Sequence, residues 1–261
     1  SRYELLMVGT GGFVSSCPDS NVLFCSFTSF TTPAQIWHHN LKDRSTQLHF
    51  KAQTGFNPSN YVIRQVFYKS NDQTRIPMFL VHKKGLDMDR HHPVFLYGYG
   101  GFNISLTPSY SSSNMIWLEN GGIYALANLR GGGEYGEKWH KQGMKLNKQN
   151  VFDDFIHAAQ YLIDQGYTTR DQIAIHGGSN GGLLVGAVTN QRPELFEVAI
   201  PAVGVMDMLR YHKFTIGWAW ADEYGTSKDS TAFRNLYQYS PLHNIEEDEN
   251  YPAVLAMTAD H

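Results

Sequence analysis

His176-Gly-Gly-Ser-Asn-Gly-Gly182 is the stretch that decides the fold of this 261-residue chain. The preceding residues 172–176, Gln-Ile-Ala-Ile-His, form the short apolar run of a buried strand. The following residues 182–188, Gly-Leu-Leu-Val-Gly-Ala-Val, are the small and apolar residues of a closely packed helix. Between them stands the pattern Gly-x-Ser-x-Gly. A strand, a sharp glycine-rich turn and a helix are the setting in which a fold can present a serine above a sheet.

The flanking glycines have a physical reason in such a turn. The serine occupies a strained backbone position, and side chains on its neighbours would collide with the adjacent strand and helix. The turn holds the serine oxygen at the N-terminus of the helix, where developing negative charge is favoured. We therefore predict that Ser179 is a nucleophile. The alternative is a glycine-rich turn that merely ends a strand.

The rest of the chain supports an α/β-hydrolase fold. From about residue 91, apolar strands alternate with helices, which predicts a mostly parallel sheet with helices on both faces. Residues 150–163 place apolar side chains along one helical stripe. Residues 1 to about 80 read as strands, with a hairpin around a polar turn at 70–74. The remaining predicted strands are 21–30, 35–40, 61–68, 76–82, 93–97, 123–128, and the buried 198–203 and 253–258.

Composition excludes several classes of partner. The net charge is −3 with both signs dispersed, so neither nucleic acid nor an anionic membrane is indicated. No apolar run approaches the ~20 residues that span a bilayer, and the first residues do not resemble a signal peptide. Cys17 and Cys25 are the only cysteines, which favours a reducing compartment and a cytoplasmic protein, although a disulfide between them stays open. Neither cysteine has metal-ligand spacing to a histidine, so we predict no metal site.

An acylated serine needs donors for the oxyanion of its tetrahedral intermediate. One donor is expected to be the backbone N–H of Asn180, the residue after the nucleophile. The second is expected from the loop after an early strand, Leu96-Tyr-Gly-Tyr-Gly-Gly-Phe-Asn103, whose glycines let the backbone approach the site and whose tyrosines offer an O–H. The alternative for this loop is a simple turn with aromatic packing.

The base that a serine nucleophile requires is not obvious in the sequence. The expected chain order is Ser, then Asp or Glu, then His. His212, in an expected helical segment, and His243, in a turn, are more readily explained as structural residues. The strand expected at 253–258 is the one whose end should carry the acid, but we assign neither Asp260 nor His261 to a triad.

Over essentially its whole length, the chain resembles the prolyl oligopeptidase family of serine peptidases. The densest segments of resemblance are Leu96-Tyr-Gly-Tyr-Gly-Gly-Phe-Asn-Ile-Ser105, Asn128-Leu-Arg-Gly-Gly-Gly-Glu-Tyr-Gly-Glu137, Gly177-Gly-Ser-Asn-Gly-Gly-Leu-Leu-Val185, Gly204-Val-Met-Asp-Met-Leu209 and Tyr239-Ser-Pro-Leu-His-Asn244. The resemblance implies an endopeptidase that cleaves short peptides on the carboxyl side of proline, through an acyl-enzyme on Ser179, as a monomer and without cofactor.

The family's site residues transfer to this sequence one by one. The resemblance implies that Asn180 contributes its backbone N–H to the oxyanion hole and that Tyr99 completes the hole with its hydroxyl. It implies that the substrate proline ring stacks on Trp220, since a flat apolar ring suits an aromatic slot. The rest of the implied proline pocket is Phe102, Val205, Ile216 and Tyr224. From the residues alone, Trp218 and Trp220 would be interpreted as core or interface aromatics.

The resemblance also divides the chain. Residues 1–55 are expected to be the last strands of a β-propeller that screens out large substrates, and residues 56–261 an α/β-hydrolase domain. The family's catalytic Asp would follow directly after His261, an Arg two residues later and the catalytic His beyond a further strand, so we expect this chain alone to be inactive. The alternatives are a non-catalytic fragment of the fold, and an esterase, against which Trp220 argues.

Overall fold

The computed structural model describes residues 7–16, 20–87 and 89–259, which form two sheets. By the density of internal contacts the chain divides into two compact units. The first comprises Ser1–Ile63, Val81–Leu86 and Thr107–Gly121, and the second comprises Arg64–Leu80, Asp87–Leu106 and Gly122–His261. The domain boundary predicted at residues 55 and 56 stays a prediction. Cys17 lies outside the described residues, and Cys25 is a free, half-buried cysteine.

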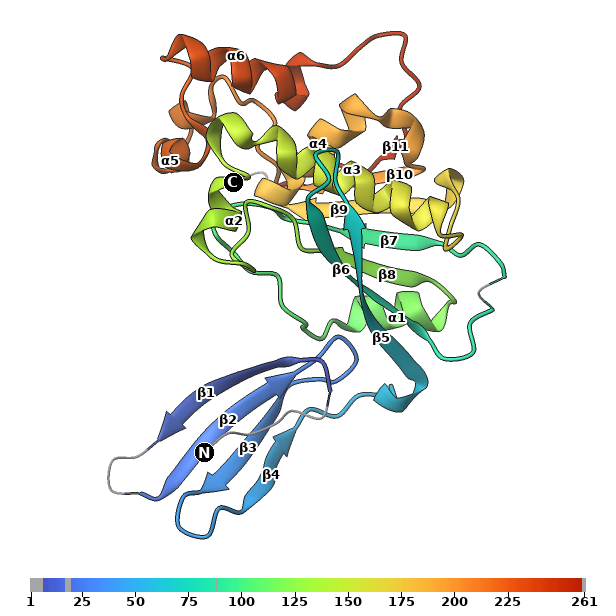
Figure 1. Ribbon diagram of the computed structural model, residues 1–261, viewed down its shortest axis with the longest axis vertical. Helices are drawn as coiled ribbons and strands as arrows, with labels where there is room; N and C mark the ends of the chain where they lie inside the picture. The colour runs from blue at the N-terminus through green and yellow to red at the C-terminus, as the bar shows by residue number, and fades with distance from the viewer. Residues whose placement is uncertain (1–6, 17–19, 88, 260–261) are drawn as a thin grey trace. The chain divides into compact units, whose positions relative to one another are not determined.

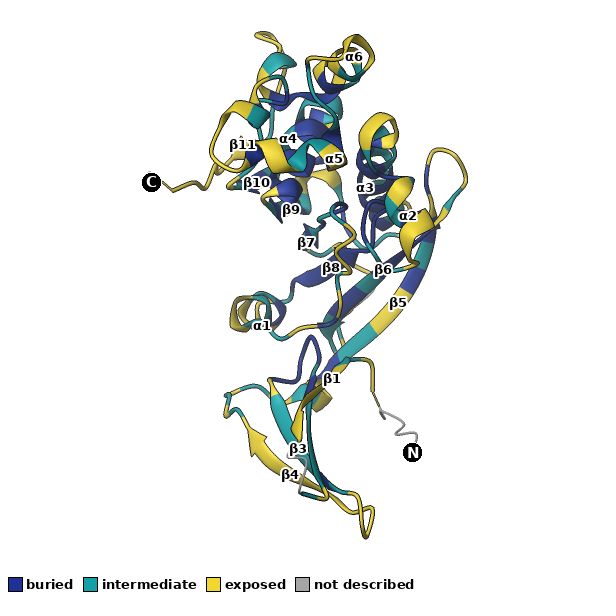
Figure 2. Cartoon of the chain, turned by 90° about the vertical axis from the view of Figure 1, so that its left-hand side faces the viewer, coloured by how far each residue is buried: buried dark blue, intermediate teal, exposed yellow. Residues whose placement is uncertain are grey.

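The first sheet is a four-stranded antiparallel meander in chain order (Figure 1). A short turn joins β3 and β4, where Asn40 N–H bonds to Ser45 O. Most of its side chains are partly or fully exposed, as the yellow β4 in Figure 2 shows. Its strands are β1 (Thr10–Ser16), β2 (Val22–Thr28), β3 (Gln35–Asn40) and β4 (Thr46–Lys51).

The second sheet has seven strands in the order β11-β10-β9-β7-β8-β6-β5. β7 pairs in parallel with β8 on one side and β9 on the other, and β10 pairs in parallel with β9 and β11. The predicted hairpin is present, with Ser70 N–H bonded to Thr74 O. The strands are β5 (Tyr61–Lys69), β6 (Arg75–Lys83), β7 (Val94–Tyr97), β8 (Ile123–Ala127), β9 (Ile173–Gly178), β10 (Val198–Ala202) and β11 (Ala253–Val254).

The helices complete the predicted α/β-hydrolase architecture. α3 (Gln149–Asp164) confirms the helical stripe, and its apolar side buries Val151, Phe152 and Phe155 completely. α4 (Asn180–Gln191) packs against β9 and β10, and α3 lies beside it (Figure 1). The other helices are α1 (Ser112–Glu119), α2 (Glu137–Lys141), α5 (Ala221–Tyr224) and α6 (Ser230–Tyr239). No helix among the described residues has both the length and the apolar character to cross a membrane.

Two expectations need correction, and one helix was missed. The strand predicted over 253–258 is regular only at 253–254, with an isolated bridge from Met257 to Ala202, and its residues through 257 are exposed rather than buried. It lies at the edge of the described sheet, so it pairs with β10 on one side only. The segment 208–213, expected to be helical, forms only a 3-10 turn at Tyr211–Lys213. Helix α1 was not predicted, because its polar and apolar residues show no helical stripe.

The order of strands determines where a site can form. From β7 the chain moves to β8 on one side of it, and the next strand, β9, lies on the other side. The loops after β7 and β9 therefore diverge at the carboxyl ends of adjacent parallel strands. In open α/β sheets this switch point is where ligands bind. Residues 98–103 and Ser179 occupy these two loops.

Candidate active site

Ser179 occupies the turn between β9 and α4 with the backbone of a nucleophile elbow. Its φ of 57° and ψ of −114° are strained for a residue with a side chain. Its N–H bonds to Ala202 O at 2.8 Å, and its carbonyl accepts bonds from the N–H groups of Gly182 and Leu183. Ser179 is exposed, whereas its neighbour Asn180 is buried. The fold thus fixes the backbone of the serine while it leaves the hydroxyl accessible.

The glycines around the elbow are required by close approach. A Cβ at Gly177 would lie 2.3 Å from Gly181 O, and one at Gly181 would lie 2.7 Å from Gly98 O. A Cβ at Gly182 would lie 2.6 Å from Gly204 Cα. Each contact is with backbone atoms, which cannot move aside as a flexible side chain can. Strand, turn and helix therefore pack at a distance that only glycine allows.

The two expected oxyanion donors both lie beside Ser179. Asn180 is the first residue of α4, where the N–H groups have no acceptor within the helix and the helix dipole favours negative charge. The Tyr99 phenol lies close enough to Ser179 for the two side chains to interact. Burial raises the pKa of Tyr99 above its ordinary value, the charges of Tyr97 and Glu223 raise it further, and the interaction with the Ser179 side chain opposes the rise. Tyr99 therefore keeps its proton and can donate it in a hydrogen bond.

Three of the expected pocket residues form one aromatic cluster. The Phe102 ring meets the Tyr224 ring edge to face at 5.6 Å and the Trp220 ring at 6.5 Å between centroids. Tyr224 is 1% exposed, whereas Phe102 and Trp220 are half-buried. Sequence reasoning missed a fourth member, Tyr211, which stacks on Trp220 at 6.4 Å with the planes 11° apart. In this cluster the Phe102 and Trp220 rings are partly exposed, and the Tyr224 ring that Phe102 contacts is buried.

Val205 and Ile216 are less closely defined. Val205 is half-buried in the loop after β10. Ile216 directly precedes the 3-10 helix Gly217–Trp220 and is 58% exposed. Trp218, in the same short helix, is 69% exposed, so it is not a core residue. The roles of Val205 and Ile216 in a pocket stay predictions.

Comparison with known proteins identifies the family of this chain. The model of the prolyl oligopeptidase family matches residues 108–261. A prolyl endopeptidase of Elizabethkingia meningoseptica is 53% identical over 240 residues, which cover 92% of this chain and 34% of that protein. A prolyl endopeptidase of Dictyostelium discoideum is 48% identical, with 92% of this chain and 32% of that protein covered. The chain belongs to the prolyl oligopeptidase family.

Solved structures of the prolyl oligopeptidase family have the same fold. One, from a study of two prolyl endopeptidases, superimposes with a TM-score of 0.95 at 48% identity and covers 99% of this chain and 38% of its own. A post-proline cleaving enzyme from Rickettsia typhi gives a TM-score of 0.89 at 36% identity, with 94% and 36% covered. The chain spans about a third of the length of the curated relatives it matches.

A buried polar cluster that the sequence did not reveal lies behind this family's elbow. Lys148 and Glu223 are 1% and 5% exposed at the side chain, and their charged atoms lie 3.8 Å apart. His140 Nε2 lies 2.7 Å from the other Glu223 oxygen. Burial lowers the pKa of Lys148 from its ordinary 10.5 to about 8, although the charge of Glu223 opposes that shift. No spacing in the sequence marks these three residues, because they come from separate segments: His140 from α2, Lys148 from the residue before α3 and Glu223 from α5.

Other groups do not extend the site. His243 Nδ1 lies 2.8 Å from the buried Ser240 Oγ, and within the described ranges no hydrogen bond joins a histidine to Ser179. Asp260 and His261 lie outside the described residues. The part of the chain that the structure describes has no group of three His, Cys, Asp or Glu side chains able to hold a metal ion.

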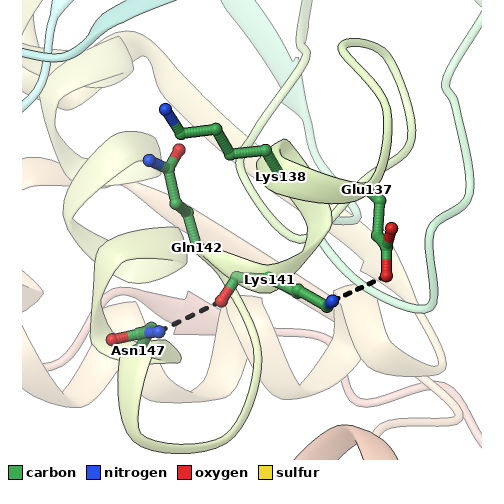
Figure 3. Close-up of a pocket in the computed structure, with 5 residues that line it drawn as sticks. All are labelled: Glu137, Lys138, Lys141, Gln142 and Asn147. Atoms are coloured by element: carbon green, nitrogen blue, oxygen red, sulfur yellow. Dashed lines mark hydrogen bonds and ion pairs between the residues drawn. The ribbon is translucent and has the colours of Figure 1, made fainter.

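A surface hollow of about 340 Å³ on α2 (Figure 3) contains no expected site residue. Its wall carries an ion pair of 2.6 Å between Lys141 and Glu137, and Asn147 donates to the Lys141 carbonyl at 3.0 Å. Lys138 and Gln142 complete the lining. The hollow is charged and open, unlike the aromatic cluster.

Proposed function

We propose that the protein to which this chain belongs is a serine endopeptidase that cleaves short peptides on the carboxyl side of proline. The observation that carries the proposal is the strained, exposed Ser179 directly before α4, with the Tyr99 phenol beside its side chain. The half-open rings of Phe102 and Trp220 add a flat apolar slot that fits a proline ring. Membership of the family supports the same reaction.

The reaction follows from these groups. Ser179 Oγ attacks the carbonyl carbon of the substrate proline and loses its proton to a general base. The oxygen of the tetrahedral intermediate becomes negative and accepts hydrogen bonds from Asn180 N–H and Tyr99 OH. The C–N bond then breaks, the amine leaves with a proton, and water releases the peptide acid from the acyl-enzyme. This chemistry requires no cofactor.

The base and its carboxylate are the parts that the described residues do not supply. We propose, from the family's order of triad residues, that they lie outside the 261 residues. By the same comparison, we propose that β1–β4 belong to a propeller, which is built from four-stranded blades of this form. We further propose a cytoplasmic monomer acting on short peptides, since only two cysteines occur and the site forms within one chain.

The second candidate is a non-catalytic protein, which is favoured by one observation: within residues 7–16, 20–87 and 89–259, no histidine is hydrogen-bonded to Ser179. A fluorophosphonate probe separates the two candidates, because it labels only an activated serine. We expect the full-length protein to be labelled at Ser179 and Ser179→Ala to be unlabelled. Absence of labelling in a folded full-length protein would favour the non-catalytic role.

The proline pocket is tested through Trp220→Ala. We expect kcat/KM for a proline peptide to fall about 10- to 100-fold, because the ring loses its stacking surface. Hydrolysis of a small ester without proline should change less than threefold. Trp218→Ala is the matched control, since its exposed ring lies in the same short helix. Equal losses on both substrates would contradict proline stacking and favour an esterase.

A further inference from the structure

Lys148 directs its ammonium at the two sides of the proposed oxyanion hole. The side chain is buried, and Nζ donates to Gly100 O at 2.9 Å and to Asn180 Oδ1 at 3.0 Å. Gly100 follows Tyr99, which carries one proposed donor, and the Asn180 backbone carries the other. A single buried cation therefore bonds to the loop after β7 and to the first residue of α4.

The Asn180 side chain is the centre of this arrangement. Its Nδ2 donates to Tyr99 O, and its Oδ1 accepts from Lys148 and from the Tyr224 hydroxyl at 2.9 Å. Asn180 thus has two parts: its N–H is the proposed oxyanion donor, and its amide side chain bonds to the Tyr99 loop and to the buried base of the aromatic cluster. The orientation of Asn180 therefore fixes the proposed N–H donor, the Tyr99 loop and the Tyr224 hydroxyl relative to one another.

Glu223 continues the connection to the proline pocket. Its Oε1 accepts the backbone N–H of Phe102 at 3.0 Å, and its Oε2 lies 2.7 Å from His140 Nε2. Phe102 has a φ of 57°, an unfavourable conformation for a residue with a side chain, so the surrounding contacts must hold it. The carboxylate therefore stabilises the loop conformation that presents the Phe102 ring to Trp220.

We infer that Lys148 and Glu223 are positioning residues that join the oxyanion hole to the proline pocket, so that Tyr99, Asn180 and Phe102 are held as one preorganised unit. The inference rests on the proposed function, because it concerns the same site. Neither residue touches the reacting atoms. Burying two charges is costly, and the distance of 3.8 Å between them is not that of a strong ion pair. The two charged groups instead make hydrogen bonds to Gly100, Asn180 and Phe102, which form the site.

The test uses the full-length protein with Lys148→Met, which keeps the length of the side chain and removes its charge and donors. Displacement of oxyanion donors should lower the rate of chemistry more than ground-state binding. We expect kcat on a proline peptide to fall about 10- to 100-fold, while KM changes less than threefold. A peptide aldehyde ending in prolinal, which forms a hemiacetal with a serine, should lose at least tenfold in affinity. The matching acyl-pyrrolidine, which lacks that carbonyl, should lose less than threefold.

A second variant guards against loss of folding. Asn180→Ala removes the central amide but keeps the backbone N–H, and we expect a similar fall in kcat. The double variant should be little worse than either single one, because both changes break the same connection. Asp154→Asn is the matched control, since it alters another buried ion pair in the same unit and should leave kcat within twofold.

The outcomes separate the two claims. If the wild-type protein neither labels at Ser179 nor cleaves after proline, the proposed function fails. If the wild type is active and Lys148→Met and Asn180→Ala keep its kcat and aldehyde affinity, the positioning role is wrong. Equal losses of kcat in Lys148→Met and Asp154→Asn would also overturn it, because a general loosening of the fold would then explain both.

Discussion

Two buried cations in the second unit differ in what they bind. Arg130 is 2% exposed and directs its guanidinium at carboxylates, with Nη2 2.6 Å from Asp154 Oδ1 and Nη1 2.6 Å from Asp72 Oδ2. Lys148 is 1% exposed, but its two short bonds go to a carbonyl and an amide oxygen, and its carboxylate lies 3.8 Å away. Arg130 is neutralised by its partners, whereas the charge of Lys148 is used on the groups that form the site.

The difference shows that burial of a charge does not by itself indicate function. The bidentate fork of Arg130 ties α3 to the turn between β5 and β6, far from Ser179 in sequence and without a bond to its loop. That geometry is typical of a structural ion pair. The point-like ammonium of Lys148 instead gathers acceptors from two separate segments. The partners of the charge, rather than its depth, distinguish the two roles.

The largest effect is expected at the structural ion pair between Arg130 and Asp154. Asp154→Asn leaves the Arg130 guanidinium buried without its main counter-charge, so we expect the free energy of unfolding to fall by about 3–5 kcal/mol. Urea unfolding of the full-length protein measures this loss. The kcat of the folded fraction should stay within twofold. A large loss of kcat at unchanged stability would mean that Arg130, too, serves the site.

The pH dependence of kcat tests the role of Lys148. Deprotonation of Lys148 near its pKa of about 8 leaves Glu223 without its cation, so we expect kcat to fall several-fold as the pH rises through that value. His140, Glu223, Tyr224 and Tyr99 are the titratable groups around the ammonium. Glu223→Gln removes the charge that raises this pKa, so the alkaline fall in kcat should move to lower pH. An unchanged pH profile of kcat in Glu223→Gln would contradict the assignment of the alkaline fall to Lys148, and with it the contrast to Arg130.

Lys148 should affect stability in the opposite direction. As the pH rises, kcat is expected to fall, but the free energy of unfolding is expected to rise. Because the folded pKa of Lys148 lies below the ordinary 10.5, the unfolded chain binds more protons between about pH 8 and 10.5. The unfavourable contribution of Lys148 is therefore present in full below pH 8 and is relieved above it. We expect the free energy of unfolding of the wild type, relative to Lys148→Met, to rise over that range. A falling difference would contradict the burial of a charged lysine.

The smallest effect is expected at the outer partner of Arg130. Asp72 has 48% of its side chain exposed, so water screens its interaction. We expect Asp72→Asn to lower the free energy of unfolding by less than about 1 kcal/mol in urea. Burial raises the pKa of Asp72, but the hydrogen bonds from Arg130 and Thr74 and the charge of Arg130 together outweigh this and lower the pKa to about 2, so the contribution should persist until strongly acidic pH. A loss as large as that of Asp154→Asn would show that Arg130 depends on both partners equally.

Local patterns predicted the elements whose own residues carry a clear signal. Strand β9, the turn at Ser179 and helix α4 follow from apolar runs and glycines within 20 residues, and the hairpin around residues 70–74 follows from its polar turn. Helix α1 and the edge strand β11 were not predicted correctly, because their environment is decided by neighbours rather than by their own sequence.

The sequence by itself determined the strained turn at Ser179, since Gly-x-Ser-x-Gly between a strand and a helix encodes it through local sterics alone, and from that turn we predicted the nucleophile. It also determined the family, through motifs spread along the chain. Only the tertiary structure decided that Tyr211 supports Trp220, and that Lys148, Glu223 and His140 meet behind Asn180. These residues come from separate segments, and no periodicity records a contact between them. They converge because the order of the parallel strands reverses at β7, so that segments distant in sequence meet at the carboxyl ends of neighbouring strands.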